Sequence, residues 1–216
     1  QFTDVTGPGG LRGAHYDDCP VWTIGWDRRA VILKLLQNGE WHTFRLPKAS
    51  YTYGSRHGWF TEWPRIRELS PGRLMMNMHG MFYEFPPDFS LSRTSGIRPL
   101  CSHLCMVVDW CRWNGRLVLA RNDTHVIHNP IDGRSQSNLW FGREEDFDDW
   151  GPRSGWGGPW RGDAVKAGRP SEPFLTEGFE HGVLHLTHDA SSAVKFTLQI
   201  DREGAGVWED YHSMRV

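Results

Sequence analysis

Short apolar runs joined by glycine-containing turns recur along this chain, and helical periodicity is nearly absent. Val21–Trp26 and Ala30–Gln37 are rich in β-branched, aliphatic or aromatic residues, and the second run ends at Asn38-Gly39. Asn-Gly between apolar runs is a strong hairpin signal. No amphipathic stretch reaches the length of an ordinary helix, and only Arg143–Asp149 could form a short one. The chain is therefore expected to be all-β.

Three further predicted hairpins share one pattern, which is a strand, a turn that contains glycine, and a second strand with large apolar residues. A longer repeat relates Ala30–Leu46 to Ala193–Val216, and it places Trp41 and Trp208 at equivalent positions, where we expect them to pack between repeats. The predicted strand pairs are Phe60–Leu69 with Arg73–Met78, Cys105–Trp113 with Arg116–Ala120, and Phe174–Phe179 with Val183–Thr187.

Matched segments this far apart are typical of sheets repeated around an axis, so we expect a β-propeller of four-stranded antiparallel blades. The 216 residues hold about four blades. They are expected to be part of a larger six- or seven-bladed ring, with the chain a fragment. Residues 1–216 would form a single propeller domain or part of one, with a loop-rich insertion at 135–168. A plain β-sandwich is the alternative.

Charge and composition exclude several classes of protein. Lys and Arg number 24 against 26 Asp and Glu, and this net charge of −2 lacks the basic surplus of a nucleic-acid binder. No apolar run approaches the roughly 20 residues of a membrane-spanning helix. The four cysteines form no C-x-x-C pair, which argues against structural zinc. We expect Cys101, Cys105 and Cys111 on one face of a strand.

The segment Glu62–Met76 resembles a blade of the sialidase-like (BNR-repeat) β-propellers, with an acid, a proline, an apolar strand, a glycine turn, a basic residue and a second apolar strand. Ser171–Leu175 is similar to another blade start, and Asp201–Trp208 is similar to a degenerate Asp-box turn. The resemblance implies a secreted or periplasmic carbohydrate-active protein. That superfamily includes glycoside hydrolases, polysaccharide lyases and non-catalytic binders, and the arginine triad of sialidases proper cannot be placed here.

The densest group of candidate site residues runs from His57 to Arg65. Glu62 could act as a general acid or base if burial raised its pKa. Arg65 could bind the carboxylate of a uronic acid through two hydrogen bonds. His57 would contact substrate, and Trp59 and Trp63 would stack on the apolar faces of sugars. A simple ion pair between Glu62 and Arg65 is the alternative.

Two later segments supply further candidates. His79, followed by glycine in an apolar strand, is a second proton-transfer candidate, with packing as the alternative. A polar loop carries Arg121 and Asp123 as substrate-binding residues and His125 as a third catalytic candidate, with a solvated turn as the alternative. Trp140 is a further stacking candidate.

These residues predict acid/base cleavage of glycosidic bonds in a poly- or oligosaccharide, within the central funnel of a propeller. A lyase acting on a uronic-acid polymer, a non-catalytic carbohydrate-binding propeller and a protein-interaction propeller are the alternatives. No cofactor is expected, although the acidic run Glu144–Asp149 could hold calcium. The expected partner is a carbohydrate, with no nucleic acid and no membrane span, and the sequence predicts no oligomeric state.

Overall fold

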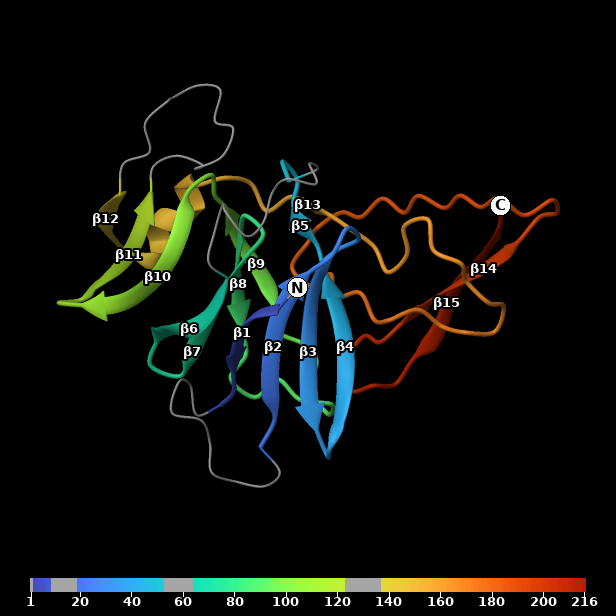
Figure 1. The fold of residues 1–216 in the computed structure, drawn as a ribbon, viewed down its shortest axis with the longest axis horizontal. Helices are drawn as coiled ribbons and strands as arrows, with labels where there is room; N and C mark the ends of the chain where they lie inside the picture. The colour runs from blue at the N-terminus through green and yellow to red at the C-terminus, as the bar shows by residue number, and fades with distance from the viewer. Residues whose placement is uncertain (1, 9–18, 53–63, 123–136) are drawn as a thin grey trace.

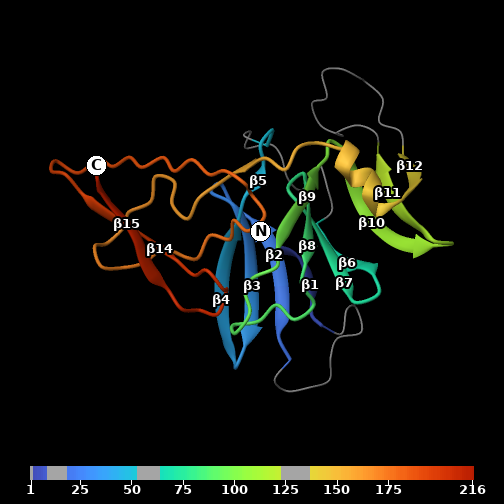
Figure 2. The same ribbon diagram turned by 180° about the vertical axis from the view of Figure 1, so that it is seen from behind.

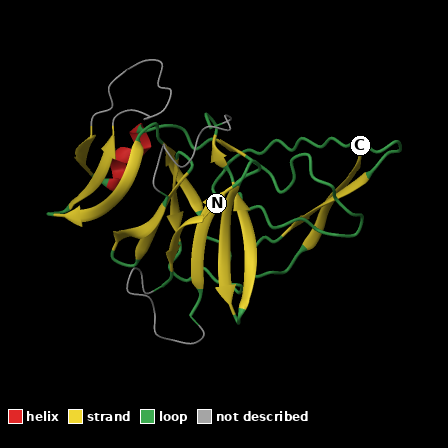
Figure 3. Cartoon of the chain, viewed as in Figure 1, coloured by secondary structure: helices red, strands yellow, loops and turns green. Residues whose placement is uncertain are grey.

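The computed structural model describes residues 2–8, 19–52, 64–122 and 137–216, and it is dominated by antiparallel sheets (Figures 1 and 3). The first sheet has the order β1 (Phe2–Thr6), β2 (Val21–Trp26), β3 (Val31–Gln37) and β4 (Glu40–Leu46). The second has the order β6 (Arg65–Ser70), β7 (Arg73–Met78), β8 (Met81–Phe85) and β9 (Arg98–Ser102). The third contains β10 (Met106–Trp113), β11 (Arg116–Asn122) and β12 (Ser137–Gly142). The all-β prediction is confirmed.

Two smaller sheets and one short helix complete the described structure. β5 (Lys48–Ala49) pairs with β13 (Gly155–Trp156), and β14 (Lys195–Ile200) pairs with β15 (Glu209–Arg215). A 3-10 helix, η2 (Glu144–Asp149), follows β12. The described sheets do not close into a ring, so the propeller stays a prediction.

The tight hairpin turns follow from residues that accept a left-handed backbone. Asn38-Gly39 and Asn114-Gly115 have positive φ at both positions, as a type I′ turn requires. His79-Gly80 joins β7 to β8 in the same way, with φ of 52° and 77°. His79 therefore lies in a turn, whereas the sequence pattern predicted a strand position for it.

The second sheet buries both of its faces, because neighbouring residues of a strand point to opposite sides. Met76 and Tyr83 belong to a core shared with the first sheet, whereas Met75 and Phe82 belong to a core shared with the third. Figures 1 and 2 show the three sheets in a row, with the β14–β15 hairpin at the end opposite β10–β12. Face-to-face stacking of β-meanders is thus the organising feature of the fold.

Several finer expectations are corrected. Phe174–Phe179 and Val183–Thr187 form no hairpin; residues 173–175 instead hydrogen-bond to Arg45 of β4. Trp41 and Trp208 are 51% and 45% exposed, so they do not pack between repeats. Cys101 lies in β9 and Cys111 in β10, on different strands, and all four cysteines are free thiols. Within 135–168, Ser137–Gly142 forms β12 of the third sheet.

Candidate functional site

Polar side chains from distant parts of the chain lie at one end of the stacked sheets, which we call the polar end. Arg65 pairs with Asn77, which is just before the β7–β8 turn that holds His79. Arg121 pairs with Val107, whose carbonyl accepts a hydrogen bond from Asn77 Nδ2 at 3.3 Å. Three predicted site residues, Arg65, His79 and Arg121, therefore lie at the same end of two adjacent sheets.

His79 is held in place from both sides of its turn. Its side chain is buried, with the residue only 1% exposed, and its ring meets the edge of Trp26 at a centroid distance of 5.6 Å. Its carbonyl accepts a hydrogen bond from the Ala49 amide at 3.1 Å. An imidazole in this position would transfer a proton from a largely desolvated environment.

A second buried histidine, His103, lies beside this turn. Its Nε2 is 2.9 Å from Asn77 Oδ1 and its Nδ1 is 3.1 Å from the Cys105 carbonyl. Each ring nitrogen therefore lies within hydrogen-bond distance of an oxygen, and the tautomer decides which of the two donates. The His103 ring also packs on Phe82, with the ring centroids 4.4 Å apart.

The remaining described candidates have core or structural contacts. Arg121 Nη1 lies 2.9 Å from Cys105 Sγ, and its guanidinium is 6.0 Å from the centre of the Trp150 ring. Trp140 stacks on Phe147 at 6.1 Å and meets the edge of Trp150 at 5.3 Å, inside the core between the second and third sheets. The other predicted site residues, His57, Trp59, Glu62, Trp63, Asp123 and His125, lie outside the described residues.

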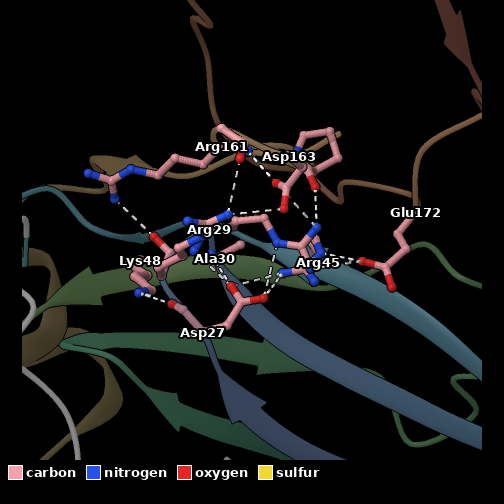
Figure 4. Close-up of polar contacts among 11 residues, drawn as sticks. Asp27, Arg29, Ala30, Arg45, Lys48, Arg161, Asp163 and Glu172 are labelled. Atoms are coloured by element: carbon pink, nitrogen blue, oxygen red, sulfur yellow. Dashed lines mark hydrogen bonds and ion pairs between the residues drawn. The ribbon is translucent and has the colours of Figure 1, made fainter. Parts of the chain in front are cut away.

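A charged cluster occupies the polar end of the first sheet, and none of its members is among the predicted site residues. Asp27, in the β2–β3 turn, accepts hydrogen bonds from the amides of Arg29 (2.7 Å) and Ala30 (3.1 Å) and pairs with Arg45 at 3.0 Å. Burial alone would raise the pKa of Asp27, but these amides and the Arg45 guanidinium hold it below its usual value. Figure 4 shows the cluster, which also contains Lys48, Arg161, Asp163 and Glu172.

Arg45 joins segments that are far apart in sequence. Its side chain is 2% exposed and pairs with both Asp27 and Glu172. Its backbone also bonds to residues 173 and 175, which fixes the later segment along β4. The sequence signal for this cluster is an arginine between two apolar residues, Phe44 and Leu46, because a charge between core positions needs a partner.

Lys48 is the most perturbed cation of this cluster. It is 4% exposed, and its Nζ donates to the Asp27 carbonyl and lies 5.3 Å from the centre of the Trp156 ring. The Arg161 guanidinium is 5.1 Å from the same ring. Burial lowers the pKa of Lys48 to about 8. Lys48 can therefore exchange a proton near neutral pH, and it is a candidate acid/base group.

The first strands of the three large sheets are linked by charges. Asp4 of β1 accepts a hydrogen bond from the Ile66 amide at 2.8 Å and pairs with Arg67 of β6 at 3.2 Å. Arg67 Nε lies 4.0 Å from Asp109 of β10. Burial raises the pKa of Asp4, although the Ile66 amide and nearby arginines oppose that shift. Strands β1, β6 and β10 thus form a neighbouring set with ionisable groups between them.

Comparison with protein-family models, with curated proteins and with solved structures found no match to this chain. Within the described ranges, no three His, Cys, Asp or Glu side chains come together as a metal ion would require. The same ranges contain no helix that is long and apolar enough to cross a membrane. The assignment of function therefore depends on the residues themselves.

Proposed function

We propose that this chain is a carbohydrate-active protein that cleaves glycosidic bonds of an anionic poly- or oligosaccharide at the polar end. One observation carries the proposal. Arg65, His79 and Arg121, singled out from three separate segments of the sequence, meet at the same end of adjacent sheets. Two guanidinium groups and an imidazole suit a sugar that bears a carboxylate.

We further propose that the β-meanders are blades of a propeller whose axis runs beside β1, β6 and β10. The stacking of the second sheet between the other two supports this arrangement, as does the ion pair between Asp4 and Arg67 of neighbouring first strands. In such a fold the polar end would surround the mouth of the central funnel. Loops at the end of a rigid scaffold are where binding residues concentrate.

The proposed chemistry is proton transfer at the glycosidic bond. Arg65 and Arg121 would bind the sugar carboxylate, and His79 or Glu62 would protonate the departing glycosidic oxygen as its bond to carbon breaks. In hydrolysis a second group removes a proton from the attacking water. In elimination a base removes the proton beside the carboxylate, and that electron pair forms the new double bond as the glycosidic oxygen leaves.

Incubation with a panel of uronic-acid polysaccharides tests the proposal. New reducing ends without ultraviolet absorbance would indicate hydrolysis, and an absorbing unsaturated product would indicate elimination. Binding without either product would leave a non-catalytic carbohydrate-binding protein. Neither binding nor cleavage across the panel would overturn the proposal.

Two variants connect activity to the named residues. His79→Asn keeps a residue that accepts the left-handed turn and removes the imidazole, and we expect a loss of activity on the order of 100-fold or more. Arg121→Lys should weaken substrate binding, because a lysine cannot bind a carboxylate through two parallel hydrogen bonds. Arg116→Lys, at the opposite end of the same strand, is the matched control and should leave activity unchanged.

A further inference from the structure

Among the described residues, the third sheet packs one of its two faces against another sheet. Leu117 and Leu119 of β11 point into the core shared with the second sheet. The other face is built of three cross-strand rows. These rows are Trp113 with Arg116, then Cys111 with Val118 and Phe141, then Asp109 with Ala120 and Leu139.

The two edge strands of this outer face carry exposed apolar side chains, whereas Val118 on the strand between them is 8% exposed. Trp113 is 60% exposed, Leu139 is 57% exposed and Phe141 is 43% exposed, and the rings of Trp113 and Phe141 are in edge contact at 6.1 Å. Contiguous exposed apolar side chains of this kind mark interaction surfaces. The second sheet, with sheets on both of its faces, shows how such a surface is covered within this molecule.

We propose that the outer face of the third sheet is the interface of a symmetric dimer, in which two copies of this chain pack these faces together with their strands antiparallel. A two-fold interface brings the same patch of both copies together, so the patch must be complementary to itself. The patch meets this requirement because it carries a positive charge at one end and a negative charge at the other. The proposal does not rest on the cleavage activity, and it places a second copy on the face that a next blade would cover in a closed ring.

Charge complementarity selects one of the two symmetric arrangements. Arg116 is exposed at the β10–β11 turn end of the face, and Asp109 lies at the other end with its side chain 54% exposed, although Arg67 Nε is 4.0 Å away. A two-fold axis perpendicular to the strands places β10 over β10 and β11 over β11 with reversed directions, so the row of Arg116 lies over the row of Asp109 in the mate and the two charges are one strand apart. An axis parallel to the strands would instead place Arg116 over Arg116, and like charges repel.

The axis perpendicular to the strands also places the central row of one copy over the central row of the other. Cys111, which is exposed, would then face Cys111 of the second copy. Stacked sheets lie about 10 Å apart, which is too far for an unstrained disulfide and within reach of a short bismaleimide. The axis parallel to the strands would place Cys111 opposite Phe141, on the far strand of the mate.

Sedimentation of the full chain over a range of concentrations tests the dimer. We expect a reversible monomer–dimer equilibrium in the wild type, and Phe141→Glu should weaken association by about 100-fold or more, because it places two facing carboxylates in the apolar central row. Val183→Glu is the control, since Val183 is 82% exposed elsewhere and the same change there should have no effect. A wild-type monomer at all concentrations, or a dimer unaffected by Phe141→Glu, would overturn the proposal.

Charge exchange tests the arrangement itself. Arg116→Glu should weaken the dimer about tenfold, and adding Asp109→Arg to it should restore association, because each pair then forms with reversed signs. Bismaleimidoethane should link two wild-type chains and fail with Cys111→Ser, whereas Cys19→Ser should still be linked. A dimer that shows neither charge rescue nor linkage through Cys111 would contradict the antiparallel packing.

Discussion

The guanidinium of Arg45 and the carboxylate of Asp27 form an ion pair of 3.0 Å that ties β4 to the β2–β3 turn, and the Arg45 side chain is almost fully buried. Glu172 pairs with the same guanidinium from a segment 127 residues away. A buried charge is costly unless it has a partner. Removing one member of this triad should therefore destabilise the contact between β4 and the segments that carry Asp27 and Glu172.

Arg45→Met should therefore destabilise the fold by about 1–3 kcal/mol, because Asp27 and Glu172 lose a buried cation and keep the more exposed Arg29 between them. Urea unfolding followed by tryptophan fluorescence would measure the change. Arg28→Met is the matched control, since Arg28 pairs with Asp163 but its side chain is 63% exposed, and we expect a change below about 1 kcal/mol. Equal effects of the two substitutions would show that the burial of Arg45 does not matter.

The lowered pKa of Lys48 gives a pH dependence with a definite sign. The ordinary pKa of 10.5 applies to the unfolded chain and a pKa of about 8 to the folded one. Between these values the unfolded chain binds more protons, so this group raises the free energy of unfolding as the pH rises from about 8 to 10.5. Below that window the buried ammonium opposes folding, by on the order of 3 kcal/mol.

Lys48→Met should remove that contribution, and Lys195→Met, at an exposed position of β14, should leave it in place. Unfolding free energies of the three proteins at several pH values between 7 and 10.5 provide the measurement. If the wild type and Lys48→Met respond identically to pH, Lys48 has an ordinary pKa in the folded protein.

Asp201 supports the turn that resembles a degenerate Asp-box. Its carboxylate accepts hydrogen bonds from the amides of Gly204 (2.9 Å), Ala205 (3.2 Å) and Gly206 (2.7 Å). Asp201→Ala leaves these amides to water, so their hydrogen exchange should accelerate at least tenfold, with little change in the cores of the large sheets. Asp189→Ala, at an exposed position outside this turn, is the control, and unaltered exchange in the Asp201 variant would refute the role of its carboxylate.

Local signals predicted the hairpins wherever a turn residue and two apolar runs agreed. Asn38-Gly39 and Asn114-Gly115 are examples, because both residues of each pair accept positive φ. Gly182 lacked a second such residue, and Val183 beside it remains 82% exposed. A glycine between apolar runs was therefore not sufficient.

The polar end was predictable only in part. Arg65, His79 and Arg121 each stood out from their neighbours in sequence, and the register of the sheets brings them together. The environment of Lys48 depends instead on Trp156, more than one hundred residues later. No local pattern encodes such a contact, because it arises from how the later segment folds back over the first sheet.

The turn that carries His79 offers a matched pair of glycines. Gly39 and Gly80 have almost the same φ, +78° and +77°, but a Cβ at Gly39 would meet open space, whereas one at Gly80 would lie 2.1 Å from Tyr51 Oη. The Tyr51 hydroxyl donates to the His103 carbonyl, so displacing it would break that hydrogen bond. Gly39→Ala should cost about 1 kcal/mol for the left-handed backbone alone.

Gly80→Ala should cost a further 1–2 kcal/mol or so, for the displaced hydroxyl and its lost bond. Tyr51→Phe separates the hydrogen bond from the ring contact: in its presence Gly80→Ala no longer breaks a hydrogen bond but its Cβ still lies 2.7 Å from the ring carbon Cζ, so its cost should fall yet stay above that of Gly39→Ala. Thermal and urea unfolding of the single and double variants would measure the coupling. Equal costs for Gly39→Ala and Gly80→Ala in the wild-type background would mean that Tyr51 does not brace the turn that carries His79.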